Sequence, residues 1–182
     1  MTTDTVAQHE AEDHLLEVVN TPGHVQRGAE STLFDQSVKR LKADGHYQCY
    51  VAETTGRPCR CGCTASNLQV HHRGREWSLE NTVDYDLLGK VAFAIDAYGY
   101  AHSAEFAGKP ITSVDDIRLL MVLGQPHHTG EVTGIHATTE PAWLAQLSDK
   151  AGWDTVPQDE SVIKQLESAK HSTLAQTPSQ AV

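Results

Sequence analysis

The chain has 182 residues, of which 39% are apolar and 21% charged, and this composition fits one compact domain. Acidic residues outnumber basic ones by 24 to 14, and the resulting net charge of -10 argues against a polybasic nucleic-acid coat. The sequence contains no apolar run long enough to span a membrane and no apolar signal-peptide core near its start. We therefore expect a cytoplasmic protein with no membrane partner.

Both ends of the chain are polar. Residues 1–30 carry six acids against one base, and residues 157–182 carry at most one short helix, expected around 161–170. These segments are predicted to be arms that flank a domain at 31–156. The acidic arms are candidates for contact with a protein partner.

The first half of the predicted domain combines a helix with two strands. Ser31 can cap a helix that ends at Gly45. The apolar face expected for this helix consists of Leu33, Phe34, Val38 and Leu41. Strands are expected at 46–53 and 67–72, on either side of a turn-rich loop, as in a hairpin.

The second half is expected to add one more apolar element and a helix. The run at 115–123 fits a strand or a helix by periodicity alone. Pro141 suits the first turn of a helix whose buried face consists of Trp143, Leu144 and Leu147. The predicted fold class is α+β.

The turn-rich loop holds three closely spaced cysteines, Cys59, Cys61 and Cys63. Cysteines one residue apart are badly placed to form a disulfide with each other, so their crowding favours a metal site. Cys49 and His127 are further candidate ligands for zinc, which prefers four sulfur or nitrogen donors. Which of the five bind stays open, and a loop of free thiols is the alternative.

Histidines form a second pattern. His71 and His72 end a predicted strand, where neighbouring side chains point to opposite faces, so one can bind a metal while the other acts as a general base. His128 and His136 follow the apolar run and could complete a metal site with His71. Histidines that are merely solvated are the alternative.

The run NLQVHHRGREWSLEN at 67–81, followed by LLMVLGQPHHTGEVTGIH at 119–136, resembles the HNH endonucleases, particularly those common in phage genomes. The resemblance implies a small ββα-metal core stabilised by zinc. It implies His71 and His128 as ligands of a catalytic divalent ion, with His136 as a possible third, and His72 as the general base. It also implies Asn81 as the intervening asparagine of the motif.

The same resemblance matches Cys61-Gly62 to the family's zinc knuckle and His127 to its distal zinc ligand. Gly124 stands where the family usually has a cysteine, so the zinc cluster must take a ligand such as Cys49 or a third loop cysteine.

With this resemblance, the sequence predicts a metal-dependent HNH-type endonuclease that hydrolyses DNA phosphodiesters. The expected location is cytoplasmic, which for a phage-encoded protein means the host cytoplasm or association with a virion. The enzyme would use a structural Zn²⁺ and a catalytic Mg²⁺, Mn²⁺ or Zn²⁺. A local basic patch is expected to contact DNA phosphates and consists of Arg57, Arg60, Arg73 and Arg75. The alternative is a non-catalytic, zinc-stabilised structural or binding protein on a degenerate HNH scaffold, such as a virion or assembly component.

Overall fold

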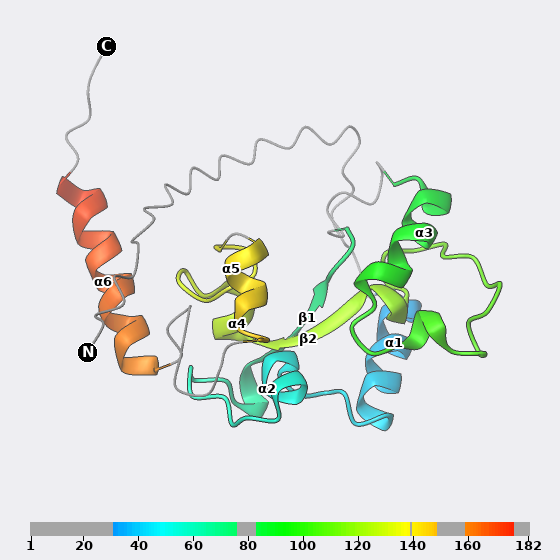
Figure 1. Cartoon of the computed structure of the whole chain (residues 1–182), viewed down its shortest axis with the longest axis horizontal. Coiled ribbons are helices and arrows are strands. Elements are labelled where there is room, and N and C mark those ends of the chain that lie inside the picture. Colours follow the sequence, from blue (N-terminus) through cyan, green and yellow to red (C-terminus); the bar gives the residue numbers. More distant parts are fainter. Residues whose placement is uncertain (1–30, 76–82, 139, 149–158, 177–182) are drawn as a thin grey trace, which may run out of the picture.

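The computed structural model describes residues 31–75, 83–138, 140–148 and 159–176. In this part of the chain, helices surround one two-stranded antiparallel sheet (Figure 1). The helices are α1 (Thr32–Ala43), α2 (Tyr50–Thr55), α3 (Tyr85–Ile95), α4 (Gln125–Thr129), α5 (Glu140–Ala145) and α6 (Glu160–Gln176). The predicted α+β class is confirmed. The predicted arm at 1–30 lies outside the described residues.

The sheet joins two segments that are far apart in the sequence. Strand β1 (Leu68–His72) pairs with β2 (Leu120–Gly124), with Leu68 opposite Gly124 and His72 opposite Leu120. The strand predicted at 67–72 is confirmed, and the apolar run at 115–123 contributes most of β2. Because the strands come from distant segments, their pairing is not visible in any local pattern.

The strand predicted at 46–53 is wrong, and so is the hairpin around the cysteine loop. Residues Tyr50–Thr55 form α2, which packs against β2 and buries Val51. A short stretch that mixes apolar and polar residues does not distinguish strand from helix by periodicity, and tertiary packing decides between them here. The helical turn places Cys49 at the N-cap of α2, beside the sheet.

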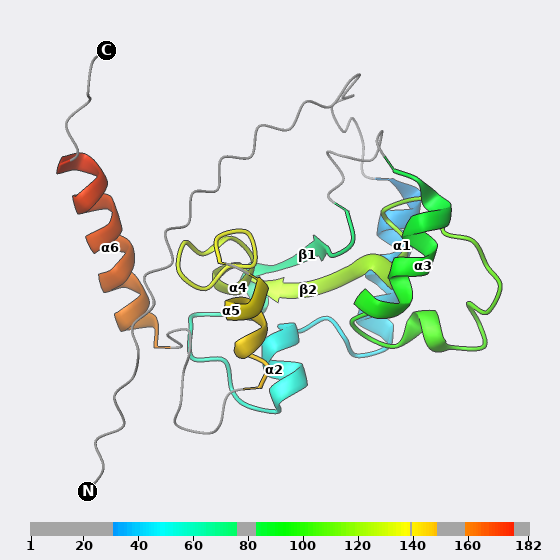
Figure 2. The ribbon, with the colours of Figure 1, turned by 45° about the horizontal axis from the view of Figure 1, so that its top comes forward.

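All five residues of β2 are buried, and its two faces contact different parts of the core. Leu120 and Val122 pack with residues of α1 and the segment after α3, whereas Met121 and Leu123 pack with α2 and α5. Figure 2 shows β2 running between these two groups of helices. The strand therefore ties both halves of the core together.

Helix α1 begins and ends as its sequence predicts. The Ser31 hydroxyl accepts a hydrogen bond from the backbone N–H of Phe34, and Gly45 takes the left-handed conformation with φ at 85°. Leu41 is fully buried, but Leu33 is exposed, so Leu33 does not belong to the buried face.

The last two helices agree in part with the predictions. In α5 Trp143 is buried as expected, whereas Leu144 is exposed. Helix α6 extends well beyond the short helix expected at 161–170 and lies in the predicted C-terminal tail, with Ile163 buried. Among the described helices, none is long and apolar enough to cross a membrane.

Candidate metal centres

Four thiols and one imidazole meet beside the end of β2. His127, in α4, is fully buried, and Cys49 caps α2, while Cys59, Cys61 and Cys63 belong to the loop before β1. The Sγ atoms of Cys49, Cys59 and Cys63 lie 3.1, 3.8 and 3.4 Å from His127 Nδ1. Cys61 Sγ lies 3.2 Å from Nε2 of the same ring. The structure thus brings together all five predicted zinc candidates.

The spacing of these atoms suits a tetrahedral ion. One ligand atom from each of Cys49, Cys59, Cys63 and His127 lies within 4.8 Å of every other. Two sulfurs bound to one zinc at about 2.3 Å are separated by about 3.8 Å, close to the 3.7 Å between the Cys49 and Cys63 sulfurs. The Cys59 and Cys61 sulfurs are only 2.8 Å apart, too close for both to bind one ion as placed. Three cysteines and His127 therefore form a cluster compatible with a structural zinc site.

The charge of the cluster also favours a cation. Hydrogen bonds with Cys59 and Cys63 lower the pKa of the Cys61 thiol to about 2, whereas hydrogen bonds with Cys49 and the other thiols raise the pKa of Cys63. The two pKa values shift in opposite directions because thiols this close together cannot all ionise unless a positive charge balances them. A thiolate-binding divalent ion such as zinc supplies that charge.

The absence of a side chain at Gly124 makes room for one of these ligands. A Cβ atom at position 124 would lie 2.1 Å from Cys63 Sγ and 2.6 Å from its Cβ. The absence of a Cβ at Gly124 therefore allows Cys63 to approach the end of β2.

We expect Gly124→Ala to weaken zinc binding because Cys63 must move. Overpacking of this kind costs about 1–3 kcal/mol, which corresponds to a loss of about 5- to 150-fold in zinc affinity. Competition with a chromogenic chelator measures this change.

Gly89→Ala is the matched control, because a Cβ at that position in α3 meets no atom within 4 Å. We expect it to leave zinc affinity unchanged and to stabilise the helix by about 1 kcal/mol. Equal zinc affinity in both variants would show that Cys63 is not a ligand.

Three histidines form a second cluster, to which α4 contributes His128, the residue after His127. His71 comes from β1, His128 from α4 and His136 from the loop that follows. The ring of His71 lies 5.2 Å from that of His128 and 5.0 Å from that of His136, centroid to centroid, and the last two are 4.9 Å apart. One nitrogen of each ring lies within 4.8 Å of the others, so the three imidazoles could hold an ion together.

A tight turn returns His136 to His128. The backbone N–H of Gly134 donates to the Gly130 carbonyl over 2.8 Å, and a Cβ at Gly134 would lie only 2.4 Å from that oxygen. Glycine is therefore required for the turn to close this tightly. The closed turn allows the backbone N–H of His136 to reach the His128 carbonyl.

The ring nitrogens of this cluster are suited to metal binding at neutral pH. Burial, and then the neighbouring histidines, lower the pKa of His71 to about 3 and that of His128 to about 4. Neutral imidazole is the form that binds a metal. Gln69 Oε1 accepts a hydrogen bond from His128 Nδ1 over 2.7 Å, which leaves the Nε2 lone pair of His128 available toward His136.

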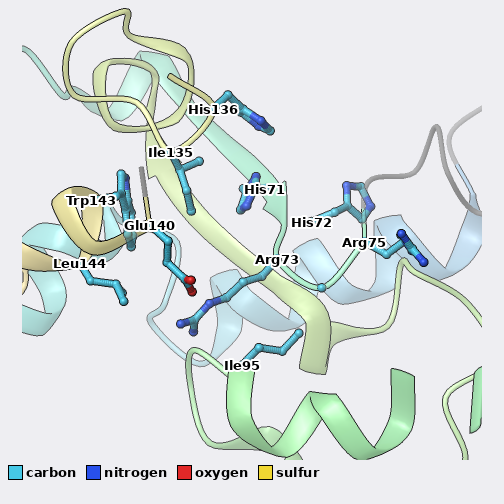
Figure 3. Close-up of a pocket in the computed structure, with 11 residues that line it drawn as sticks. His71, His72, Arg73, Arg75, Ile95, Ile135, His136, Glu140, Trp143 and Leu144 are labelled. Carbon is cyan, nitrogen blue, oxygen red and sulfur yellow. The ribbon is translucent and has the colours of Figure 1, made fainter. Parts of the chain in front are cut away.

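A pocket of about 410 Å³ opens beside His71 and His136 (Figure 3). Arg73 and Arg75 line it, whereas Arg57 and Arg60 do not. Only half of the predicted basic patch therefore lies at the histidine cluster. Figure 3 also shows the Glu140 side chain, from the start of α5, pointing toward Arg73.

His72 lines the same pocket but belongs to the opposite face of β1 from His71 (Figure 3). Its ring is buried, stacks on Phe34 at 5.8 Å, and places Nε2 2.8 Å from Asp115 Oδ1. Asn81, the predicted asparagine of the motif, lies outside the described residues.

Sequence reasoning overlooked three of these side chains, Gln69, Asp115 and Glu140. Gln69 lies two residues before His71, and the period of two along a strand could have placed it on the face of the histidine cluster. Asp115 and Glu140 had no comparable signal, because Asp115 meets His72, and Glu140 reaches the pocket, from distant segments.

Comparison of the chain with protein-family models, with curated proteins and with solved structures found no match. What the protein does is therefore inferred from its two side-chain clusters and from the pocket beside the second.

Proposed function

We propose that the protein is a metal-dependent endonuclease of the HNH type that hydrolyses DNA phosphodiesters. The observation that carries the proposal is the position of the cluster of His71, His128 and His136 beside His72. This cluster is built on two antiparallel strands followed directly by a helix, the order expected of a ββα-metal core.

The three-histidine cluster suits hydrolytic chemistry. Three protein ligands leave coordination positions for water and substrate. A divalent ion bound there supplies stabilisation of the phosphate and of the leaving oxygen. His72 lines the adjoining pocket, where its imidazole would accept the proton of the attacking water.

The pocket also carries the charge needed to hold a phosphodiester. Arg73 and Arg75 lie beside the histidines and would contact phosphate oxygens. The chain as a whole carries a net charge of -10, which would weaken adherence to DNA elsewhere on the surface. DNA binding would accordingly be confined to the face that bears the pocket.

The cysteine cluster would have a structural role in this protein. A zinc ion held by Cys49, Cys59, Cys63 and His127 would fasten α2 and the cysteine loop to the start of α4. His127 and His128 are adjacent, so the same short helix would present one ligand to each ion.

A second candidate is a zinc-stabilised structural or binding protein without catalytic activity, such as a virion or assembly component. The burial of His72 and its hydrogen bond with Asp115 favour this candidate, because core histidines are commonly bonded in this way. The acidic arms would then contact a protein partner.

Incubation of the full chain with supercoiled plasmid in Mg²⁺ or Mn²⁺ tests the proposal. We expect nicked and linear DNA to accumulate and excess chelator to stop the reaction. The same assay on His72→Gln, purified identically, excludes a contaminating nuclease. Intact plasmid in Mg²⁺, Mn²⁺ and Zn²⁺, from a protein that holds one zinc per chain, would support the second candidate instead.

A further inference from the structure

Asp115 is placed to hold the proposed general base in one orientation. Asp115 is 2% exposed and His72 8%, so their hydrogen bond is shielded from water. A carboxylate only accepts hydrogen bonds, so the Nε2 atom of His72 must donate to it. The lone pair of the neutral ring is then left on Nδ1, and Nδ1 is the nitrogen able to take a proton.

The carboxylate itself is held in place from a different part of the chain. The Ser31 hydroxyl, at the start of α1, donates a hydrogen bond to the second carboxylate oxygen. The Ser37 hydroxyl donates to the backbone carbonyl of Asp115 over 2.9 Å. Ser31 caps α1 and Ser37 lies within it, so Asp115 has hydrogen-bond partners on this helix in addition to His72.

The ring of His72 is restrained from a second direction as well. Phe34 stacks on it with an angle of 22° between the ring planes. A ring stacked on one face and hydrogen-bonded at one nitrogen has little freedom to rotate, and general-base catalysis depends on such alignment.

From these contacts we infer that Asp115 is a positioning residue, which fixes His72 as the Nε2–H tautomer with Nδ1 as its proton acceptor. The inference rests on the proposed function for the identity of the base. The inference also gives a role to the long segment between β1 and β2, because Asp115 lies near the end of that segment.

The test compares Asp115→Leu, which is similar in shape but accepts no hydrogen bond, with Ser31→Ala. The serine variant removes the helix cap and one partner of the same carboxylate but keeps the bond between His72 and Asp115. We expect kcat for plasmid cleavage to fall about 100-fold in Asp115→Leu, with KM within threefold of wild type. In Ser31→Ala we expect kcat within threefold of wild type.

A second measurement does not depend on activity. Long-range ¹H–¹⁵N spectra of the zinc-loaded wild-type chain, with His72 assigned through His72→Gln, report which ring nitrogen carries the proton. We expect Nε2–H as the single form in the wild type and in Ser31→Ala, and a mixture of tautomers in Asp115→Leu. A wild-type ring protonated on Nδ1, or an equal kcat in Asp115→Leu, would overturn the inference.

The two proposals fail in distinguishable ways. If the wild type leaves DNA intact while His72 carries its proton on Nε2, the endonuclease proposal fails. The role of Asp115 in orienting His72 is then still supported. If the wild type cleaves DNA and Asp115→Leu cleaves it equally fast, only the role of Asp115 is wrong.

Discussion

Replacement of His72 by alanine is expected to reduce the rate of DNA cleavage about 1,000-fold. A positioned general base contributes about 100- to 10,000-fold to a hydrolysis rate, and the other imidazole of β1, that of His71, belongs to the opposite face of the strand (Figure 3). Single-turnover cleavage of plasmid in Mn²⁺ measures the loss. Zinc content and the melting temperature of each preparation show whether the variant is folded.

His72→Gln separates a catalytic role from a structural one. The glutamine amide can still donate to Asp115, so the core contact is retained while the base is lost. We expect Gln to be as inactive as Ala but more stable, because Ala leaves a buried carboxylate with one partner fewer, at a cost of about 1–3 kcal/mol. A Gln variant that cleaves at the wild-type rate would show that His72 only packs the core. His102→Gln, an exposed histidine bonded to the Phe93 carbonyl, is the matched control and should cleave normally.

Removal of zinc is expected to unfold the domain. Binding of a structural zinc contributes about 10–16 kcal/mol in small zinc-binding peptides, as much as the whole stability of many domains. In this chain the cysteine cluster anchors α2, the loop and α4 to the buried strand β2. We therefore expect loss of near-ultraviolet circular dichroism on chelation, with recovery when zinc is returned.

Single substitutions identify which thiols bind the ion. Cys63→Ser and His127→Ala should each release zinc and unfold the chain, because both residues belong to the fitting set of four. Cys61→Ser should keep one zinc per chain, since the Cys61 sulfur lies too close to that of Cys59 for both to be ligands. Metal analysis of each purified variant measures how much zinc it retains. If Cys61→Ser loses zinc and Cys59→Ser keeps it, Cys61 is the ligand and Cys59 is not.

Local features of the fold could be predicted from the sequence. The cap at Ser31 and the left-handed Gly45 bound α1 as expected, because both depend only on neighbouring backbone groups. The alternation of Leu68 and Val70 similarly marked β1. The closely spaced cysteines and the paired histidines also indicated both clusters, because grouped thiols and imidazoles are typical of metal sites.

Features set by distant contacts could not be predicted in the same way. The stretch at 46–53 has strand-like composition, yet α2 forms where Val51 packs against β2. The strand that pairs with β1 lies about fifty residues away in the sequence, and the carboxylate that meets His72 lies 43 residues away. Asp115 appears in the sequence only as one of two acids before an apolar run, with nothing to indicate a histidine partner.

The pairing of β1 with β2 also fixes the position of the histidine cluster relative to the cysteine cluster. Leu68 comes five residues after Cys63 and lies opposite Gly124, while His71 lies further along the same strand, opposite Met121. A slip of β1 by a single position would exchange the sides on which His71 and His72 project. The length of the connection from Cys63 to Leu68 therefore determines which residues of β1 project to each face of the sheet. A one-residue insertion in this connection would misplace both imidazoles although both histidines are still present.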